Sequence, residues 1–371
     1  MSVHRRAGAR GNRYDVRFRT PDGEHRKRTF RTRREADAFE AQQRADLSRG
    51  SWLDPRDAER TFGEVARHWL ERDVAKRSST LGREETILRV HILPTLAGRR
   101  LRTIRQPDVQ ALVNSWTVLS KPRTVRRHYG VLRAVLAYAV ECDYLARTPC
   151  RGVKLPEVAP LDRPQLTPGQ VVALADAMGT DLGPMVYLGA ILGLRWGECA
   201  GLRVGRIDLE ERRLVVAEQL TRGKYGVHFF GEPKSHAGRR TLAMPEALVS
   251  ILAELLAYRG LTQADSDALV FTTPGGQPLR YEHWRRRRWM SACEAAGVVG
   301  VTFHDLRRAN ATGLLAEGVD VRTAQARLGH SDPRMTLAIY AQATTEGDRR
   351  AADVLGARFL GATESRAIDA P

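Results

Sequence analysis

The length, composition and charge of the chain limit what it can be. Its 371 residues, 42% of them hydrophobic, are too many for one compact core and suit two or three folded domains. The formal net charge of +17 indicates a polyanionic partner, although a basic surface that only aids solubility is the alternative. No apolar run approaches bilayer length, the first residues do not resemble a signal peptide, and the four cysteines lack CxxC spacing. We therefore expect a cytoplasmic protein with reduced thiols and without a membrane segment, a disulfide framework or a metal site.

The N-terminal part is predicted to be a small basic unit, residues 1–55. Its first 34 residues hold twelve Lys or Arg against three acidic residues. Residues 14–19 alternate like a strand, a turn follows, and residues 27–30 return as a second strand. Thr32 is suited to cap a helix that continues to about Leu47. We expect two or three strands backed by one helix, a ribbon that can enter a major groove or contact phosphates alone. The candidate DNA-binding residues here are Arg17, Arg19, Arg26 and Arg28.

Residues 61–150, after a linker near residues 50–55, are predicted to be a helical domain. Phe62, Val65 and Trp69 share one helical face with Leu70, and residues 124–140 form a second amphipathic stretch. Pro94 ends or kinks the helix between them. A helical bundle with a merely solvated basic face is the alternative to a DNA-binding domain. The candidate DNA-binding residues are Lys121, Arg123, Arg126 and Arg127.

A proline-containing linker at residues 151–164 leads into a third domain. Thr167, Pro168 and Gln170 form a capping box with proline at the first helical position. Beyond it we expect helices together with a small sheet that includes residues 213–218 and 240–243. This domain extends to about residue 360, and residues 361–371 form a loose polar tail.

The last half of the chain contains six side chains that suit chemistry at a phosphodiester. A guanidinium forms a planar fork that holds two phosphate oxygens and stays protonated. Histidine and arginine at positions i and i+3 lie on the same face of a helix, and a tyrosine oxygen can attack phosphorus. The six candidate catalytic residues are Arg195, Lys234, His304, Arg307, His330 and Tyr340.

The order, spacing and local sequence of these residues resemble the tyrosine recombinase (phage integrase) family. The resemblance covers nearly the whole chain and is strongest over residues 165–345. It has two small departures: Arg308-Ala-Asn310 stands where His-Thr often follows the arginine, and Tyr340 comes ten residues after His330 where many members have nine. It implies a multidomain, mainly α-helical protein with small β-sheets (α+β), comprising an arm-site-binding, a core-binding and a catalytic domain.

The resemblance also implies a role for each candidate. Tyr340 attacks the phosphorus with His304 as its base, and Lys234 protonates the leaving 5′-oxygen; Lys224 is the competitor for that lysine. A 3′-phosphotyrosine stores the bond energy, so we expect no metal, ATP or other cofactor. Glu198 supports the first arginine at a helix start. The groups that stabilise the charge of the phosphorane are Arg195, Arg307 and His330.

The implied function is integration of a temperate phage or integrative element at DNA attachment sites in the bacterial nucleoid. The basic N-terminal unit favours an integrase over a minimal Xer-type recombinase. Four copies should assemble on two duplexes, and a DNA-bending host factor and an excisionase are further candidate partners. A type IB topoisomerase is the alternative enzyme. A silent DNA-binding regulator would need a broken active site, whereas all six positions are filled here.

The charge of the chain makes a direct prediction about DNA binding. Affinity for duplex DNA should fall by about 10³–10⁵-fold between 50 and 200 mM salt if roughly six to ten phosphates are contacted, because each contact releases counterions. Fluorescence anisotropy over this salt range measures the slope. A binding constant that stays flat would contradict the inference of a polyanionic partner.

Overall fold

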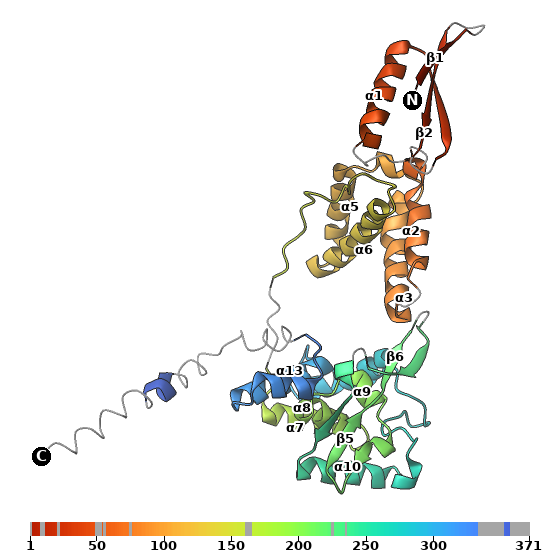
Figure 1. Cartoon of the computed structure of the whole chain (residues 1–371). Coiled ribbons are helices and arrows are strands. Elements are labelled where there is room, and N and C mark those ends of the chain that lie inside the picture. The colour runs from red at the N-terminus through yellow and green to blue at the C-terminus, as the bar shows by residue number, and fades with distance from the viewer. Residues whose placement is uncertain are drawn as a thin grey trace, which may run out of the picture. The chain divides into compact units, whose positions relative to one another are not determined.

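The computed structural model describes ten parts of the chain: residues 2–7, 12–20, 23–48, 54, 57–73, 76–159, 165–223, 226–233, 236–332 and 352–356. Lys224, Lys234, Tyr340 and the predicted tail lie outside the described residues, as does most of the linker predicted near residues 50–55. The chain divides into two compact units, residues 1–160 and 161–371 (Figure 1). Both combine helices with small antiparallel sheets, which confirms the predicted fold class. No helix in the described parts is long and apolar enough to cross a membrane.

The first unit begins with a three-stranded antiparallel sheet in the order β1-β2-β3, covered on one face by helix α1. Val16 and Phe18 are buried, and the ring of Phe39 on the helix lies 5.9 Å from that of Phe18. Thr32 accepts a hydrogen bond from the backbone of Glu35, as a helix cap does. The two predicted strands and the helix are confirmed, and β1 adds a strand that was not placed in advance. The elements are β1 (Ser2–Arg6), β2 (Arg13–Arg19), β3 (His25–Phe30) and α1 (Arg33–Ser48).

The rest of this unit is a helical domain. Thr61 forms a capping box at the start of α2, whose buried residues include Phe62, Val65 and Trp69, as the periodicity predicts. The helix before Pro94 changes type at a π-helical turn, η2, in agreement with a kink ahead of the proline. Its helices are α2 (Phe62–Glu71), α3 (Ser78–Ile87), η2 (Leu88–Ile92), α4 (Leu93–Leu96), α5 (Gln106–Leu119) and α6 (Pro122–Glu141).

Residues 150–156 are bound to the helical domain by side chains that contact their backbone. The Tyr129 hydroxyl donates to the carbonyl of Cys150 at 2.9 Å. The amide side chain of Gln110 bonds both the N–H and the carbonyl of Lys154, at 2.8 and 3.1 Å. Arg126 donates through Nε to the carbonyl of Pro156 at 2.9 Å. The first part of the predicted 151–164 linker is therefore docked on α5 and α6.

His128 is a buried polar residue in the core of this domain. Its ring stacks on His91 with centroids 4.0 Å apart and meets Trp116 edge to face at 5.5 Å. Burial, together with the nearby His91 and Arg127, lowers the pKa of His128 to about 4. The imidazole is therefore neutral at physiological pH.

The hydrophobic core of the second unit is built around helix α8 and lies beside the candidate site. Helix α8 is apolar on all sides and packs against α7, α10 and α13, which brings the residues that follow α8 next to α13. The capping box predicted at Thr167 is present at the start of α7. Its helices are α7 (Pro168–Met178), α8 (Gly183–Ile191), α9 (Trp196–Ala200), α10 (Glu246–Tyr258), α11 (Tyr281–Trp284), η8 (Arg285–Trp289), α12 (Met290–Ala295), α13 (Phe303–Ala316) and α14 (Val321–Leu328).

Two small antiparallel sheets accompany these helices. One has the strand order β4-β5-β8 and contains both predicted strand segments, and the other is the hairpin of β6 and β7. The hairpin packs on α9. The strands are β4 (Ile207–Asp208), β5 (Arg213–Val216), β6 (Gln219–Arg222), β7 (His228–Gly231) and β8 (Arg240–Ala243).

The buried imidazole predicts acid sensitivity of the helical domain. Because the folded-state pKa of His128 is below the usual 6.5, its contribution to stability is complete above pH 6.5 and is lost as the pH falls towards 4. We expect a loss of about 2 kcal/mol between pH 7 and pH 5. Hydrogen exchange of α6 amides at the two pH values, corrected for intrinsic rates, measures it. His128→Phe should remove most of this loss; an unchanged pH dependence in the variant would exclude His128 as its source.

Candidate active site

Arg195 and Glu198 form the start of helix α9. Arg195 is the N-cap residue, and its backbone N–H donates to the Glu198 carboxylate at 3.0 Å. Its guanidinium donates to the same carboxylate at 2.7 Å while the side chain stays 35% exposed. Glu198 is almost fully buried. The carboxylate therefore fixes both the backbone and the side chain of an arginine that still reaches solvent.

A second arginine, Arg240, contacts the same carboxylate. It lies at the first position of β8 and donates to the two oxygens of Glu198 at 2.9 and 3.3 Å. Burial alone would raise the pKa of Glu198, but Arg240 and Arg195 outweigh burial and hold that pKa below its usual value. The sequence analysis missed Arg240, because nothing in its local pattern shows that β8 begins beside α9.

Arg307 on helix α13 lies deeper than the helical spacing suggested. It is 2% exposed and donates to the carbonyls of Gly193 and Leu328. Its Nε–H is buried, and the described residues offer it no hydrogen-bond partner. Burial, and the positive charges of Arg195 and Arg240, lower the pKa of Arg307 to about 9, so it stays protonated at neutral pH. This guanidinium links the segment before α9 to the end of α14.

His304 and His330 occupy different depths. His304, one turn before Arg307 on α13, is exposed, whereas His330, two residues after the end of α14, is buried. Burial lowers the pKa of His330 to about 4, with Arg307 and Arg195 adding to the effect. His330 is therefore a neutral imidazole at physiological pH.

Two glycines allow these segments to meet. Gly193 has φ +66° and Gly329 has φ +61°, a backbone region that favours glycine. A Cβ on Gly193 would lie 2.7 Å from a methyl carbon of Leu328, and one on Gly329 would lie 2.7 Å from the Ala237 carbonyl. The Gly329 carbonyl also accepts from Arg195 at 3.4 Å. Neither position has room for a side chain.

Asn310, which belongs to one of the two departures from the family pattern, has a structural role here. Its side-chain amide donates to the carbonyls of Ala190 and Ile191, at 3.0 and 2.8 Å, which are at the end of α8. Helix ends leave carbonyls without partners, and Asn310 satisfies two of them from α13. It therefore holds α8 and α13 together just before Gly193.

The described part of the site carries more positive than negative charge. Arg195, Arg240 and Arg307 lie around one carboxylate, that of Glu198. The carbonyls of Gly193 and Leu328 accept from Arg307, and the carbonyl of Gly329 accepts from Arg195. These neutral groups stabilise the two cations without cancelling their charge. Such a site favours an anion with several oxygens.

Comparison with known proteins identifies the family. Residues 165–346 match the Phage integrase family, and residues 62–155 match the Phage integrase central domain. The chain belongs to the phage integrase family. It is 29% identical over 357 residues to a putative prophage phiRv2 integrase of Mycobacterium tuberculosis, which covers 92% of each chain. It is 28% identical over 325 residues, 84% of each chain, to the integrase of Mycobacterium phage D29.

Solved structures of integrases share the fold of this chain. The Tn1549 transposon integrase, in complex with a circular intermediate DNA, has a TM-score of 0.67 at 21% identity and covers 80% of this chain and 99% of its own. A lambda integrase dimer bound to a COC′ core site has a TM-score of 0.59 at 18% identity, with 90% and 93% covered. The fold of the integrase family thus extends over most of the chain.

The N-terminal sheet separates the four arginines that were predicted to bind DNA. Phe18 pairs with Arg26, so Arg26 shares the helix-covered face, and Arg28 lies there too, 5.0 Å from the Phe39 ring. Arg26 also forms ion pairs with Glu24 and Asp54. Directly opposite residues in an antiparallel pair share a face, so Arg17 and Arg19 lie on the outer face. Lys27 and His25, their partners across the strands, are the outer-face residues that the sequence analysis missed.

The four candidate cations of the helical domain lie together. All are exposed at the start of helix α6, where Lys121 is the N-cap residue. Arg126 is engaged with the Pro156 carbonyl. Positive side chains at a helix N-terminus oppose the helix dipole, so this arrangement favours an anion as their partner. Besides Arg126, the exposed cations at this helix start are Lys121, Arg123 and Arg127.

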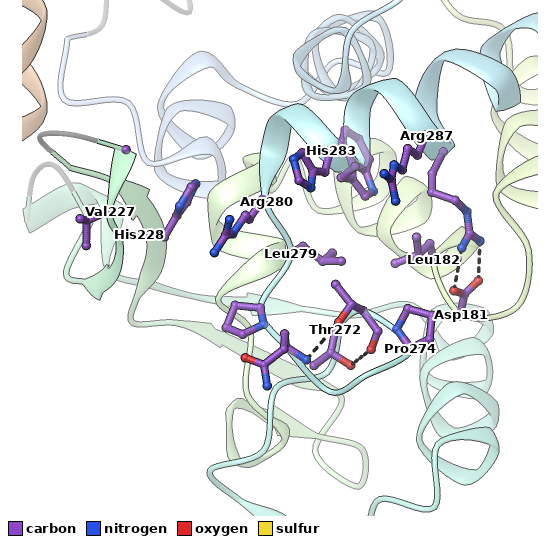
Figure 2. Close-up of a pocket in the computed structure, with 16 residues that line it drawn as sticks. Asp181, Leu182, Val227, His228, Thr272, Pro274, Leu279, Arg280, His283 and Arg287 are labelled. Atoms are coloured by element: carbon purple, nitrogen blue, oxygen red, sulfur yellow. Dashed lines mark hydrogen bonds and ion pairs between the residues drawn. The ribbon is translucent and has the colours of Figure 1, made fainter.

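A further basic pocket of about 910 Å³ is lined by none of the predicted catalytic residues that the structure describes. Figure 2 shows Arg280, His283 and Arg287 lining it from the α11 and η8 region, opposite Thr272 and Pro274. Neighbouring Arg288 is paired with Asp181 at 2.8 Å. The run of four arginines at 285–288 is the sequence signal for this surface.

The Glu198 carboxylate should be needed for the stability of the second unit. Glu198→Gln leaves buried Arg240 without a charged partner, and we expect the second unit to lose about 3 kcal/mol of unfolding free energy. Urea unfolding measures the loss. Glu254→Gln, at an exposed position on α10, is the matched control and should change stability by less than about 0.5 kcal/mol. Equal stabilities of the two variants would show that the buried ion pairs do not hold this site together.

Proposed function

We propose that this integrase-family chain is a site-specific recombinase that cuts and rejoins DNA through a 3′-phosphotyrosine intermediate. It integrates, and also excises, a phage or integrative element at DNA attachment sites. The observation that carries the proposal is the convergence of Arg195, Arg307 and His330, from segments far apart in the sequence, on a site with surplus positive charge.

The charge distribution supports phosphate as the ligand of this site. Arg195, whose side chain is 35% exposed, is held in place by Glu198, and Arg307 has a buried Nε–H to which the described residues offer no acceptor. Buried donors are rarely left unpaired, so an anion that enters the site supplies an acceptor for this one. Removing one such preorganised donor costs roughly 3–4 kcal/mol in the activation barrier of comparable reactions.

The chemical step follows from the assigned roles. Tyr340 attacks phosphorus, and since a phenol has a pKa near 10, only about a thousandth is ionised at neutral pH. His304 is exposed on α13 and accepts the tyrosine proton. His330, neutral because of its low pKa, donates a hydrogen bond to a phosphate oxygen. Lys234 protonates the leaving 5′-oxygen, a contribution typically worth about 10²–10⁴-fold.

DNA binding is assigned to three parts of the chain in this proposal. Residues 1–55 form an arm-type DNA-binding domain whose outer face presents Arg17 and Arg19, and residues 61–150 form the core-binding domain. Residues 165–360 form the catalytic domain, and residues 361–371 are a tail. The exposed cations at the start of α6 contact phosphates, because they add to the partial positive charge of the helix N-terminus.

Assembly and partners are also proposed. A lambda integrase, which shares this fold with a TM-score of 0.56 at 17% identity, has been solved as a tetramer bound to a Holliday junction. We infer that four copies of the present chain assemble on two attachment sites. A DNA-bending host factor and an excisionase are the proposed accessory partners, in the nucleoid of a bacterial host.

Covalent trapping tests the proposed function. On a nicked suicide duplex that carries the element's attachment site, wild type should form a protease-sensitive protein–DNA adduct, and Tyr340→Phe should form none. Tyr258→Phe, at an exposed position on α10, is the matched control and should trap DNA like wild type. An electrophoretic gel with labelled DNA measures the adduct.

Each failure has a separate meaning. Adduct formation by Tyr340→Phe would assign the nucleophile to another residue. Binding of the site without any adduct from wild type would contradict the recombinase proposal and favour a DNA-binding regulator. Relaxation of a supercoiled plasmid that lacks attachment sites, at the same rate as one that carries them, would favour a topoisomerase.

A further inference from the structure

Arg240 joins three parts of the active site through one guanidinium. Besides the two hydrogen bonds to Glu198, it donates to the carbonyl of Arg327 in the last turn of α14 at 2.6 Å. It also donates to the carbonyl of Gly238 at 3.0 Å, which closes the turn that precedes β8. The side chain is 6% exposed, so none of these bonds competes strongly with water.

Two of the three parts have additional support. The Glu198 carboxylate also accepts from the backbone and the guanidinium of Arg195. The end of α14 is also bound through the Leu328 carbonyl by Arg307. Loss of Arg240 therefore leaves these two parts with another partner in place. For the turn at His236–Gly238, the side-chain hydrogen bond among the described residues comes from Arg240, which donates to the Gly238 carbonyl.

The same turn fits closely against the residue before His330. A Cβ on Gly329 would lie 2.7 Å from the carbonyl oxygen of Ala237 and 3.2 Å from a guanidinium nitrogen of Arg240. A turn that is released from Arg240 has little room to move toward α14 and must move away from the site. This turn begins two residues after Lys234 in the chain.

We propose that Arg240 is a positioning residue for the proton donor to the leaving group. By binding the turn at His236–Gly238 to Glu198 and to the end of α14, it fixes the chain next to Lys234 relative to Arg195. This inference rests on the proposed function, in which Lys234 protonates the leaving oxygen. Arg240 itself donates all its described bonds to protein groups and has no assigned contact with DNA.

The chemistry of the leaving group offers a selective readout. In cleavage, the Tyr340 oxygen forms a bond to phosphorus, the P–O5′ bond breaks, His304 takes the tyrosine proton, and Lys234 gives a proton to O5′. A 5′-bridging phosphorothiolate replaces O5′ by sulfur. A thiolate is a stable leaving group, since thiols have a pKa near 8.5, so it departs without a proton. The sulfur substrate therefore bypasses the proton donor and leaves the other roles unchanged.

The experiment compares single-turnover cleavage of the oxygen and sulfur forms of one nicked attachment-site duplex by the full chain. Arg240→Met should slow cleavage of the oxygen substrate about 100-fold and stay within about threefold of wild type on the sulfur substrate. The ratio of the two rates comes from one protein preparation, so it does not depend on the fraction that is folded. Arg240→Lys keeps a donor for some of the four acceptors and should fall between wild type and Arg240→Met.

Three reference variants make the result decisive. Lys234→Ala should show the same selective loss as Arg240→Met, and Arg195→Ala should lose activity on both substrates. Arg213→Met, an exposed arginine on the adjacent strand β5, is the matched control and should behave like wild type. Equal loss on both substrates in Arg240→Met, or no loss on either, would overturn the proposal.

Failure of the underlying function would look different. Absence of any adduct from wild type on both substrates would contradict the recombinase assignment itself. A Lys234→Ala variant that sulfur does not restore would place the proton donor elsewhere, and the role of Arg240 would fail with it.

Discussion

The buried carboxylate of Glu198, held between Arg195 and Arg240, is the interaction on which the rest of the site depends. A carboxylate this deeply buried is tolerated only when it is paired and hydrogen-bonded, so its two arginines are constrained as strongly as it is. One of them begins α9, which follows the central helix α8, and the other begins β8. A single charge thus joins the helical core of the second unit to its sheet.

The arginines and histidines of the site differ in their exposure to solvent. Arg195 and His304 face solvent, whereas Arg307 and His330 lie behind them, and backbone carbonyls orient the deeper guanidinium. Groups that are fixed in advance need little reorganisation when charge develops on a bound phosphate, and burial strengthens their effect. In the proposed reaction, the accessible groups meet the DNA first and the buried ones respond to the transition state.

Local sequence patterns predicted much of this fold. The capping boxes, the alternating strand of the N-terminal unit and the helix that carries His304 and Arg307 all depend on neighbouring residues, and the structure has them. Contacts between distant segments were not predictable in the same way. Helical spacing predicted that His304 and Arg307 share a helix, but it did not predict that one is exposed and the other buried. No sequence pattern showed that Arg240 reaches Glu198. The two faces of the N-terminal sheet could have been predicted from the sequence. The strand register that separates Arg17 from Arg26 follows from the alternation of apolar and polar residues along the strand.

The docked segment at residues 150–156 sets the length of the tether between the two units. Gln110 and Arg126 hold the chain as far as Pro156, and Leu166 packs against the core of the second unit. The ten Cα–Cα steps from Pro156 to Leu166 span at most about 36 Å even when fully extended. That is close to one helical repeat of B-DNA, which is about 34–36 Å. The tether therefore cannot bridge attachment points that lie much more than one turn apart on a common duplex, whatever sequence the DNA has.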